Sequence, residues 1–232
     1  RGLGDVYKRQ IKSIAEKDGS CVFVGRCADY ALRDYPYKNY HKISGANGLG
    51  CYSRFPILSA HPVRYASLNN GSIAYKIKVN GDTLLVVNNH LESNKLTEKD
   101  KEVYREMMKD PDKQKVSQGS RLLIRKLAEA SAIRAVQADS IARLVAGYKG
   151  GGIIVCGDFN DPPGTFTYET LKNGLKDGFQ TAGEGYGATY RGFHHLLRID
   201  YLFHSTLLEG IKYKVIPYDM SDHNPVYLEV GL

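Results

Sequence analysis

The pattern of hydrophobic and polar positions predicts several strands, two of them joined in a hairpin. Residues 72–79 alternate between apolar and polar side chains, and the pair Asn80-Gly81 has the sequence of a two-residue hairpin turn. Residues 83–87 then return as an uninterrupted apolar run. Residues 153–156 and 196–203 form further apolar runs. Polar residues follow the first run and charged residues interrupt the second, a pattern that is typical of a strand end or of a functional site.

The longest predicted helix covers residues 120–148, where apolar and small side chains recur at helical spacing. Three glycines at residues 150–152 end it, and residues 165–175 predict a second helix. Because helices alternate with strands, the pattern indicates the α/β class. The long helix has a stripe that would let it lie close against a sheet, formed by Leu127, Ser131, Ala135, Ala138, Ala142 and Val145.

Three other segments have weaker patterns. Residues 8–18 show helical spacing and predict a short surface helix. The glycine-rich residues 45–50 predict a turn between strands, since their spacing does not match a nucleotide-binding glycine loop. Residues 94–119 are polar and predict a short exposed helix and loop, in which Thr97 and Asp100 have the spacing of a capping pair.

Length and composition indicate a single globular domain over residues 1–232. The chain contains 42% hydrophobic and 25% charged residues, and no apolar run approaches the ~20 residues that span a bilayer. The 32 Lys and Arg exceed the 25 Asp and Glu, and the net charge of +7 favours a polyanionic or phosphorylated substrate. The four cysteines lack the spacing of a structural zinc site.

Polar residues suited to metal binding and proton transfer follow the predicted strands. In an extended chain, side chains two apart face the same way, so Asp158 and Asn160 are expected to point together. Each cluster alone also fits an ordinary turn. Taken together, the clusters favour coordination of a hard divalent cation and attack of water on a phosphate ester. The four clusters are Asn88 with His90, Asp158 with Asn160, Arg198 with Asp200, and Asp222 with His223.

Four short motifs occur in a fixed order along the chain. They are Asn-x-His at 88–90, Gly-Asp-Phe-Asn at 157–160, Arg-Ile-Asp-Tyr at 198–201 and Ser-Asp-His-Asn-Pro at 221–225. Together with residues 48–57, they resemble the endonuclease/exonuclease/phosphatase superfamily, of which deoxyribonuclease I is a familiar member. The resemblance implies a four-layer α/β/β/α sandwich of two packed, mainly antiparallel or mixed sheets, with the site at one edge.

The resemblance also implies the roles of the polar residues that would bind the attacking water and the metal ion. Asp158 would orient or deprotonate the attacking water, and Asn160 would hold the phosphate or the metal shell nearby. Asp222 would be a ligand of the metal ion. The implied ion is Mg2+, with Mn2+ or Ca2+ as alternatives, because carboxylate oxygens suit hard cations.

Two histidines would act on the phosphate. His223, held in one tautomer by Asp200, would serve as acid, base or charge stabiliser, since a carboxylate raises the pKa of an imidazole. His90 would act from the opposite side. The implied substrates are phosphate esters in nucleic acids, phospholipid headgroups or inositol phosphates, and the protein is expected to be a monomer. Residues 94–119 and the glycine- and tyrosine-rich loop predicted at residues 178–192 are expected to select the substrate.

The start of the chain departs from the family pattern. Neither the early strand with its metal-facing Asn nor the Leu-Gln-Glu block is found, because Gln10 is followed by Ile11, and Glu16 lies in the predicted surface helix. We therefore expect an N-terminal truncation, and weaker metal binding through the loss of one carboxylate. Some bacterial members carry an upstream anchor or export signal, so localisation would depend on upstream residues.

Two alternative functions fit parts of the sequence. Residues 157–161 match the Gly-Asp-x-x-Asp element of calcineurin-like dinuclear phosphoesterases, but Asn89 and His90 precede that element, and this order argues against the alternative. A degenerate sandwich that binds phosphate or polyanions without catalysis would fit the absent Glu and the basic charge. A binding surface alone, however, would not need the full set of acids and histidines.

Overall fold

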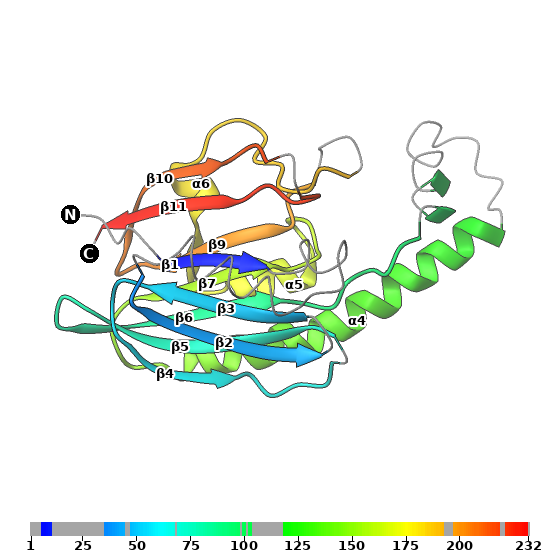
Figure 1. Ribbon diagram of the computed structural model, residues 1–232. Helices are drawn as coiled ribbons and strands as arrows, with labels where there is room; N and C mark the ends of the chain where they lie inside the picture. Colours follow the sequence, from blue (N-terminus) through cyan, green and yellow to red (C-terminus); the bar gives the residue numbers. More distant parts are fainter. Residues whose placement is uncertain are drawn as a thin grey trace.

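The protein is built on one six-stranded mixed sheet (Figure 1). In this computed structural model its strands lie in the order β4 (Ile57–Pro62), β5 (Gly71–Val79), β6 (Asp82–His90), β7 (Ile153–Asp158), β9 (Asp200–Ser205) and β8 (Leu175–Asp177). Only β6 and β7 are parallel neighbours. The structure describes residues 6–10, 35–44, 47–67, 69–97, 99–100, 102–103, 118–192, 197–218 and 221–231.

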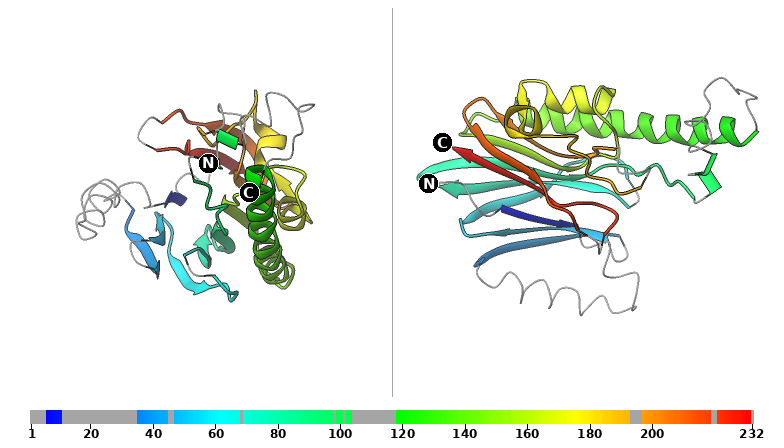
Figure 2. Two further views of the ribbon diagram at one scale, coloured as in Figure 1. Left: turned by 90° about the vertical axis from the view of Figure 1, so that its right-hand side faces the viewer. Right: turned by 90° about the horizontal axis from the view of Figure 1, so that it is seen from above.

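Helices cover one face of this sheet and two smaller sheets cover the other (Figure 2). Helix α4 (Gln118–Ala146) lies in the crossover that parallel strands require, between β6 and β7, and α5 (Phe166–Lys172) packs beside it. The short helix α6 (Gly178–Ala182) follows β8. The smaller sheets are β1 (Val6–Gln10), β3 (Asn47–Ser53) and β2 (Tyr37–Ser44) in that order, and β10 (Glu209–Val215) with β11 (Val226–Gly231).

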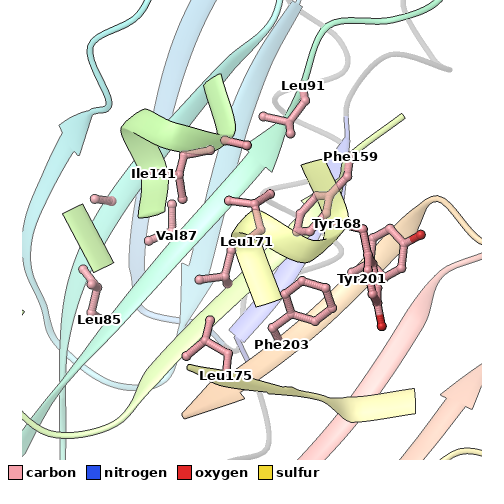
Figure 3. Close-up of a cluster of buried hydrophobic side chains, with 13 residues drawn as sticks. Leu85, Val87, Leu91, Ile141, Phe159, Tyr168, Leu171, Leu175, Tyr201 and Phe203 are labelled. Atoms are coloured by element: carbon pink, nitrogen blue, oxygen red, sulfur yellow. The ribbon is translucent and has the colours of Figure 1, made fainter. Parts of the chain in front are cut away.

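Strand β6 separates two hydrophobic cores. Leu85 and Val87 belong to the core beneath α4 and α5, whereas Leu84 and Val86 belong to the core beneath the smaller sheets. Successive side chains of a strand point to opposite faces, so a strand covered on both faces is apolar throughout. The helix-side core contains the residues labelled in Figure 3: Leu85, Val87, Leu91, Ile141, Phe159, Tyr168, Leu171, Leu175, Tyr201 and Phe203.

Most of the local structure predicted from the sequence is confirmed. Asn80 and Gly81 join β5 to β6 with φ angles of 51° and 97°, the left-handed values that a tight hairpin turn requires. The side chain of Thr165 accepts a hydrogen bond from the main chain of Tyr168 and caps α5. The α/β class and the packed sheets are also confirmed. No described helix is long and apolar enough to cross a membrane.

Two predictions in the N-terminal part of the chain were partly wrong, and each also includes residues outside the described part of the structure. Residues 8–10 of the predicted helix at 8–18 belong to strand β1, and residues 11–18 lie outside the described part of the chain. Of the glycine turn predicted at residues 45–50, residues 47–50 belong to β3, and residues 45 and 46 lie outside the described part of the chain. Glycine is required inside the strand at residue 48, because a Cβ there would lie 2.6 Å from the hydroxyl of Tyr40.

Three further predictions need correction. Of the stripe predicted along the long helix, Ala138 is fully buried, whereas the other members are half-buried. The strand predicted at 196–203 begins only at Asp200, and helix α6 occupies the start of the loop predicted at 178–192. The buried residues of α4 include a charged and an amide side chain, and they are Ser120, Leu123, Ala130, Arg134, Gln137, Ala138 and Ile141.

Candidate active site

Three adjacent strands bring three predicted site residues into one row. His90 at the end of β6 is the register partner of Asp158 at the end of β7, and Asp158 is the register partner of Asp200 at the start of β9. Register partners on neighbouring strands point to the same face of a sheet. All three residues are buried. The sheet itself therefore places an imidazole and two carboxylates side by side.

The carboxylate of Asp158 lies between two imidazoles. Its Oδ2 atom is 3.7 Å from Nε2 of His90 and 4.0 Å from Nε2 of His223. Both separations exceed hydrogen-bond length, so a small group could interact with all three side chains. The second oxygen, Oδ1, accepts a hydrogen bond of 2.9 Å from the main-chain N–H of Asn160, which fixes the orientation of the carboxylate.

His223 is held on its other ring nitrogen by Asp200. Nδ1 of His223 donates to Oδ2 of Asp200 over 2.8 Å. Burial alone lowers the pKa of His223, but the hydrogen bond to Asp200 and the charges of nearby carboxylates outweigh burial and raise the pKa from 6.5 to about 9. The imidazole is therefore protonated at neutral pH in the metal-free protein.

Two residues of the glycine- and tyrosine-rich segment support the Asp200–His223 pair. The Oγ1 atom of Thr189 accepts hydrogen bonds of 3.0 Å from the main-chain N–H groups of both Ile199 and Asp200. The ring of Tyr190 packs against the imidazole of His223, with 5.0 Å between ring centroids. Neither residue was identified from the sequence, because no motif or periodicity marks a single Thr or Tyr in a loop.

Asn160 does not follow the extended geometry that the sequence suggested. The strand ends at Asp158, and Asn160 has a left-handed φ of 54°. Its side-chain Nδ2 donates to the main-chain oxygen of Leu91 over 3.0 Å, which links the segments after β6 and β7. The expectation that Asp158 and Asn160 share one face of a strand was therefore wrong in its premise, because the chain turns between them.

Arg198 and Asp200 are buried charged residues, and each therefore needs a partner that compensates its charge. Their partners lie on different elements. Nη1 of Arg198 donates to Oδ2 of Asp177 over 2.7 Å. Its guanidinium also faces the rings of Phe179 and Tyr201, at 4.7 and 4.8 Å from their centroids. Arg198 therefore pairs with Asp177, whereas Asp200 pairs with His223.

A group that could hold a metal ion is formed by Asp158, Asp200 and His223. One ligand atom from each of these three residues lies within 4.8 Å of the others. Two carboxylates in such a group fit a hard divalent cation, which prefers oxygen ligands. Asp222, the metal ligand predicted from the sequence, is exposed and lies outside this group. Its main-chain oxygen accepts a hydrogen bond from the main-chain N–H of Arg191, and its role stays a prediction.

The fold and this row of acids and histidines define the class of α/β phosphoesterases. The chain belongs to the Endonuclease/Exonuclease/phosphatase family, whose sequence pattern matches residues 21–223. The protein is therefore a hydrolase of a family that acts on phosphate esters with a divalent metal. Neither the calcineurin-like alternative nor the non-catalytic binding module is favoured by this match. No curated protein gives a significant sequence match.

Several solved structures share the fold at low sequence identity. The crystal structure of a humanised Danio rerio TDP2 with 14 mutations has 14% identity and a TM-score of 0.62, covering 90% of this chain and 82% of that chain. A Bacteroides thetaiotaomicron mannosyl-6-phosphatase has 17% identity and a TM-score of 0.61, covering 91% and 82%. The human Nocturnin catalytic domain has 16% identity and a TM-score of 0.61, covering 98% and 80%.

Proposed function

We propose that this protein hydrolyses phosphate esters with a water molecule activated by Asp158, while His90 and His223 act on the phosphate. The observation that carries the proposal is the position of Asp158 Oδ2, which faces the Nε2 atoms of both histidines at 3.7 and 4.0 Å. A buried carboxylate between two imidazoles can accept a proton from water while the imidazoles contact the oxygen atoms of a phosphate.

Asp158 acts as the general base in this proposal. Its Oδ1 atom is occupied by the main-chain N–H of Asn160, so Oδ2 is the oxygen that takes the proton of the attacking water. The amide of Asn160 lies at the same strand end and is proposed to hold the phosphate. Because Asp158 is buried, its orientation is fixed before the substrate binds, which lowers the entropic cost of reaction.

The two histidines supply positive charge and protons. Without a metal ion, the pKa of His223 is raised to about 9, so the imidazole carries a proton on both ring nitrogens at neutral pH. Nδ1–H donates to Asp200, and Nε2–H is left to donate to a phosphate oxygen or to the leaving group. His90 approaches the same carboxylate from the neighbouring strand and is proposed to contact the phosphate from the other side.

The proposed cofactor is Mg2+, with Mn2+ or Ca2+ as alternatives. Asp222 is proposed as the metal ligand from the family motif, and Asp200 is the carboxylate of the candidate metal group that is not assigned as the base. A bound divalent ion would neutralise negative charge on the phosphate oxygens and polarise the phosphorus for attack. The residues themselves orient the water and donate protons.

The proposed substrates are phosphodiesters of nucleic acids, with phospholipid headgroups and inositol phosphates as further candidates. Among proteins of this fold, a Danio rerio TDP2 structure contains a single-strand DNA product, and another neighbour is a mannosyl-6-phosphatase. The net charge of +7 supports a polyanion. Residues 94–119 and 178–192 are proposed as the segments that select among these esters.

The test is hydrolysis of bis(p-nitrophenyl) phosphate and of plasmid DNA with Mg2+, Mn2+ or Ca2+, and with chelator. We expect cleavage that requires a divalent ion and that is lost in Asp158→Ala and His223→Ala. Asp82→Ala, an exposed Asp at the β5–β6 turn, is the matched control and should retain activity. Cleavage that continues in chelator would exclude the metal mechanism, and full activity in Asp158→Ala would exclude its role as base.

A further inference from the structure

A buried guanidinium on α4 connects the two strand ends that carry His90 and Asp158. Arg134 is only 2% exposed and is among the largest fully buried side chains of the described residues. Its Nη2 atom forms an ion pair of 2.7 Å with Oδ1 of Asp161, three residues after Asp158. Its Nη1 atom donates over 2.8 Å to the main-chain oxygen of Glu92, two residues after His90. One side chain therefore bonds to both segments.

The contacts around Arg134 form a clamp, which consists of Arg134, Gln137, Glu92, Asn94 and Asp161. Gln137, on the next turn of α4, accepts a hydrogen bond of 2.9 Å from the main-chain N–H of Glu92. The helix therefore binds both the N–H and the C=O of one residue. Nη1 of Arg134 also donates to Oδ1 of Asn94 over 2.8 Å. These contacts fix the direction in which the chain leaves β6.

The two clamped segments are also bonded to each other next to the catalytic row. The main-chain N–H of Leu91 donates to the main-chain oxygen of Asp158 over 2.9 Å, and Nδ2 of Asn160 donates to the main-chain oxygen of Leu91 over 3.0 Å. Any rotation of the chain after β6 or β7 would therefore displace His90, Asp158 or Asn160. A shift of about 1 Å in a catalytic group can lower a rate 100-fold.

We propose that Arg134 is a positioning residue of the phosphoesterase site, which holds His90 and Asp158 at their working separation through Glu92 and Asp161. A buried charge is costly to remove from water, and its fixed fork of donors is suited to holding several oxygen atoms at once. The inference rests on the proposed function of the site. It goes beyond that function by assigning a role to a buried residue of α4 that lies outside the row of acids and histidines.

The first comparison is between Arg134→Met and the double variant Arg134→Met with Asp161→Asn. The single variant leaves the carboxylate of Asp161 buried without its cation, and we expect lower thermal stability and a kcat reduced roughly 10- to 100-fold with KM changed less than about threefold. The double variant removes both charges. We expect it to recover stability but not kcat, because the bonds to Glu92 and Asn94 remain absent.

Two further variants separate charge from geometry. Arg134→Lys keeps the charge but not the planar fork, so we expect stability near that of the parent and an intermediate kcat. Arg125→Met is the matched control, because Arg125 lies on the same helix with a side chain 76% exposed and pairs with Glu129. This control should retain the parent kcat and KM.

Amide hydrogen exchange provides a readout that does not depend on activity. We expect exchange at Leu91 and Glu92 to be at least about tenfold faster in Arg134→Met and in the double variant, while amides of the β5–β6 hairpin keep their protection. Recovery of both kcat and Leu91 protection in the double variant would overturn the proposal. If the parent protein hydrolyses no tested ester, the proposed function fails, and unchanged exchange at Leu91 would separately overturn the clamp.

Discussion

Oδ2 of Asp200 lies 2.8 Å from Nδ1 of His223, and this hydrogen bond joins the six-stranded sheet to the segment that leads into β11. Asp200 is fixed by its register with Asp158, so its bond to His223 also determines where the second ring nitrogen points. That nitrogen lies 4.0 Å from Asp158 Oδ2. The register between β7 and β9 therefore determines the position of His223, which itself lies outside the sheet.

Replacing Asp200 by Asn should impair His223 without removing it. We expect kcat to fall roughly 10- to 100-fold, because an amide neither compensates the imidazolium nor selects the same ring orientation. The pKa of His223 in chelator, followed by NMR, should fall from about 9 toward 6.5. Asp82→Asn is the matched control at an exposed position. An unchanged pKa in Asp200→Asn would contradict this assignment.

The hydroxyl of Thr189 can be tested by an isosteric change. Thr189→Val leaves the main-chain N–H groups of Ile199 and Asp200 without their acceptor, and one unsatisfied buried group costs about 1–3 kcal/mol. We expect this loss in the free energy of urea unfolding, together with reduced kcat. Thr189→Ser keeps the oxygen and should recover most of both quantities. Parent-like stability and kcat in Thr189→Val, together with a loss of both in Thr189→Ser, would show that the methyl group, rather than the hydroxyl, matters.

Asn160 combines a special backbone conformation with a candidate phosphate contact, and two substitutions separate them. Gly accepts the φ of 54° without strain, whereas Ala does not, so Asn160→Ala should be less stable than Asn160→Gly by about 1 kcal/mol. Both variants lose the amide, and we expect both to lose activity to a similar degree. Full activity in Asn160→Gly would mean that only the backbone of residue 160 serves the reaction.

The sequence predicted those parts of the site that lie at strand ends and in motifs. His90, Asp158 and Asp200 each follow or begin an apolar run, and a sheet places such positions in one row. The residues that hold the site in place were not predicted, because their role depends on which side chains of α4 contact which loop segments in the folded protein. Arg134 had a signal that was not used: it interrupts the buried face of α4, where a charge requires a partner.

Helix α4 also has a polar contact near its first turns that should affect stability in acid. The carboxylate of Asp100 accepts hydrogen bonds from Nζ of Lys126 and from the main chain and hydroxyl of Thr97, as the predicted capping pair requires. The bond to Lys126, followed by those to Thr97, lowers the pKa of Asp100 from 3.8 to about 2. Because the pKa is lower in the folded state than in the unfolded state, the ionised carboxylate stabilises the folded protein at pH values above the unfolded-state pKa. This stabilisation is lost as the pH falls through the folded-state pKa.

Replacing Lys126 by Met should therefore raise the pKa of Asp100 toward 3.8 and destabilise the protein most above pH 4. The difference in unfolding free energy between parent and variant should shrink as pH falls from 3.8 through about 2, where Asp100 becomes protonated in the parent as well. Urea unfolding from pH 2 to pH 6 measures it. Lys149→Met, an exposed change beyond the other end of α4, is the control. A difference that stays constant across this pH range would show that Lys126 acts through packing instead of through its charge.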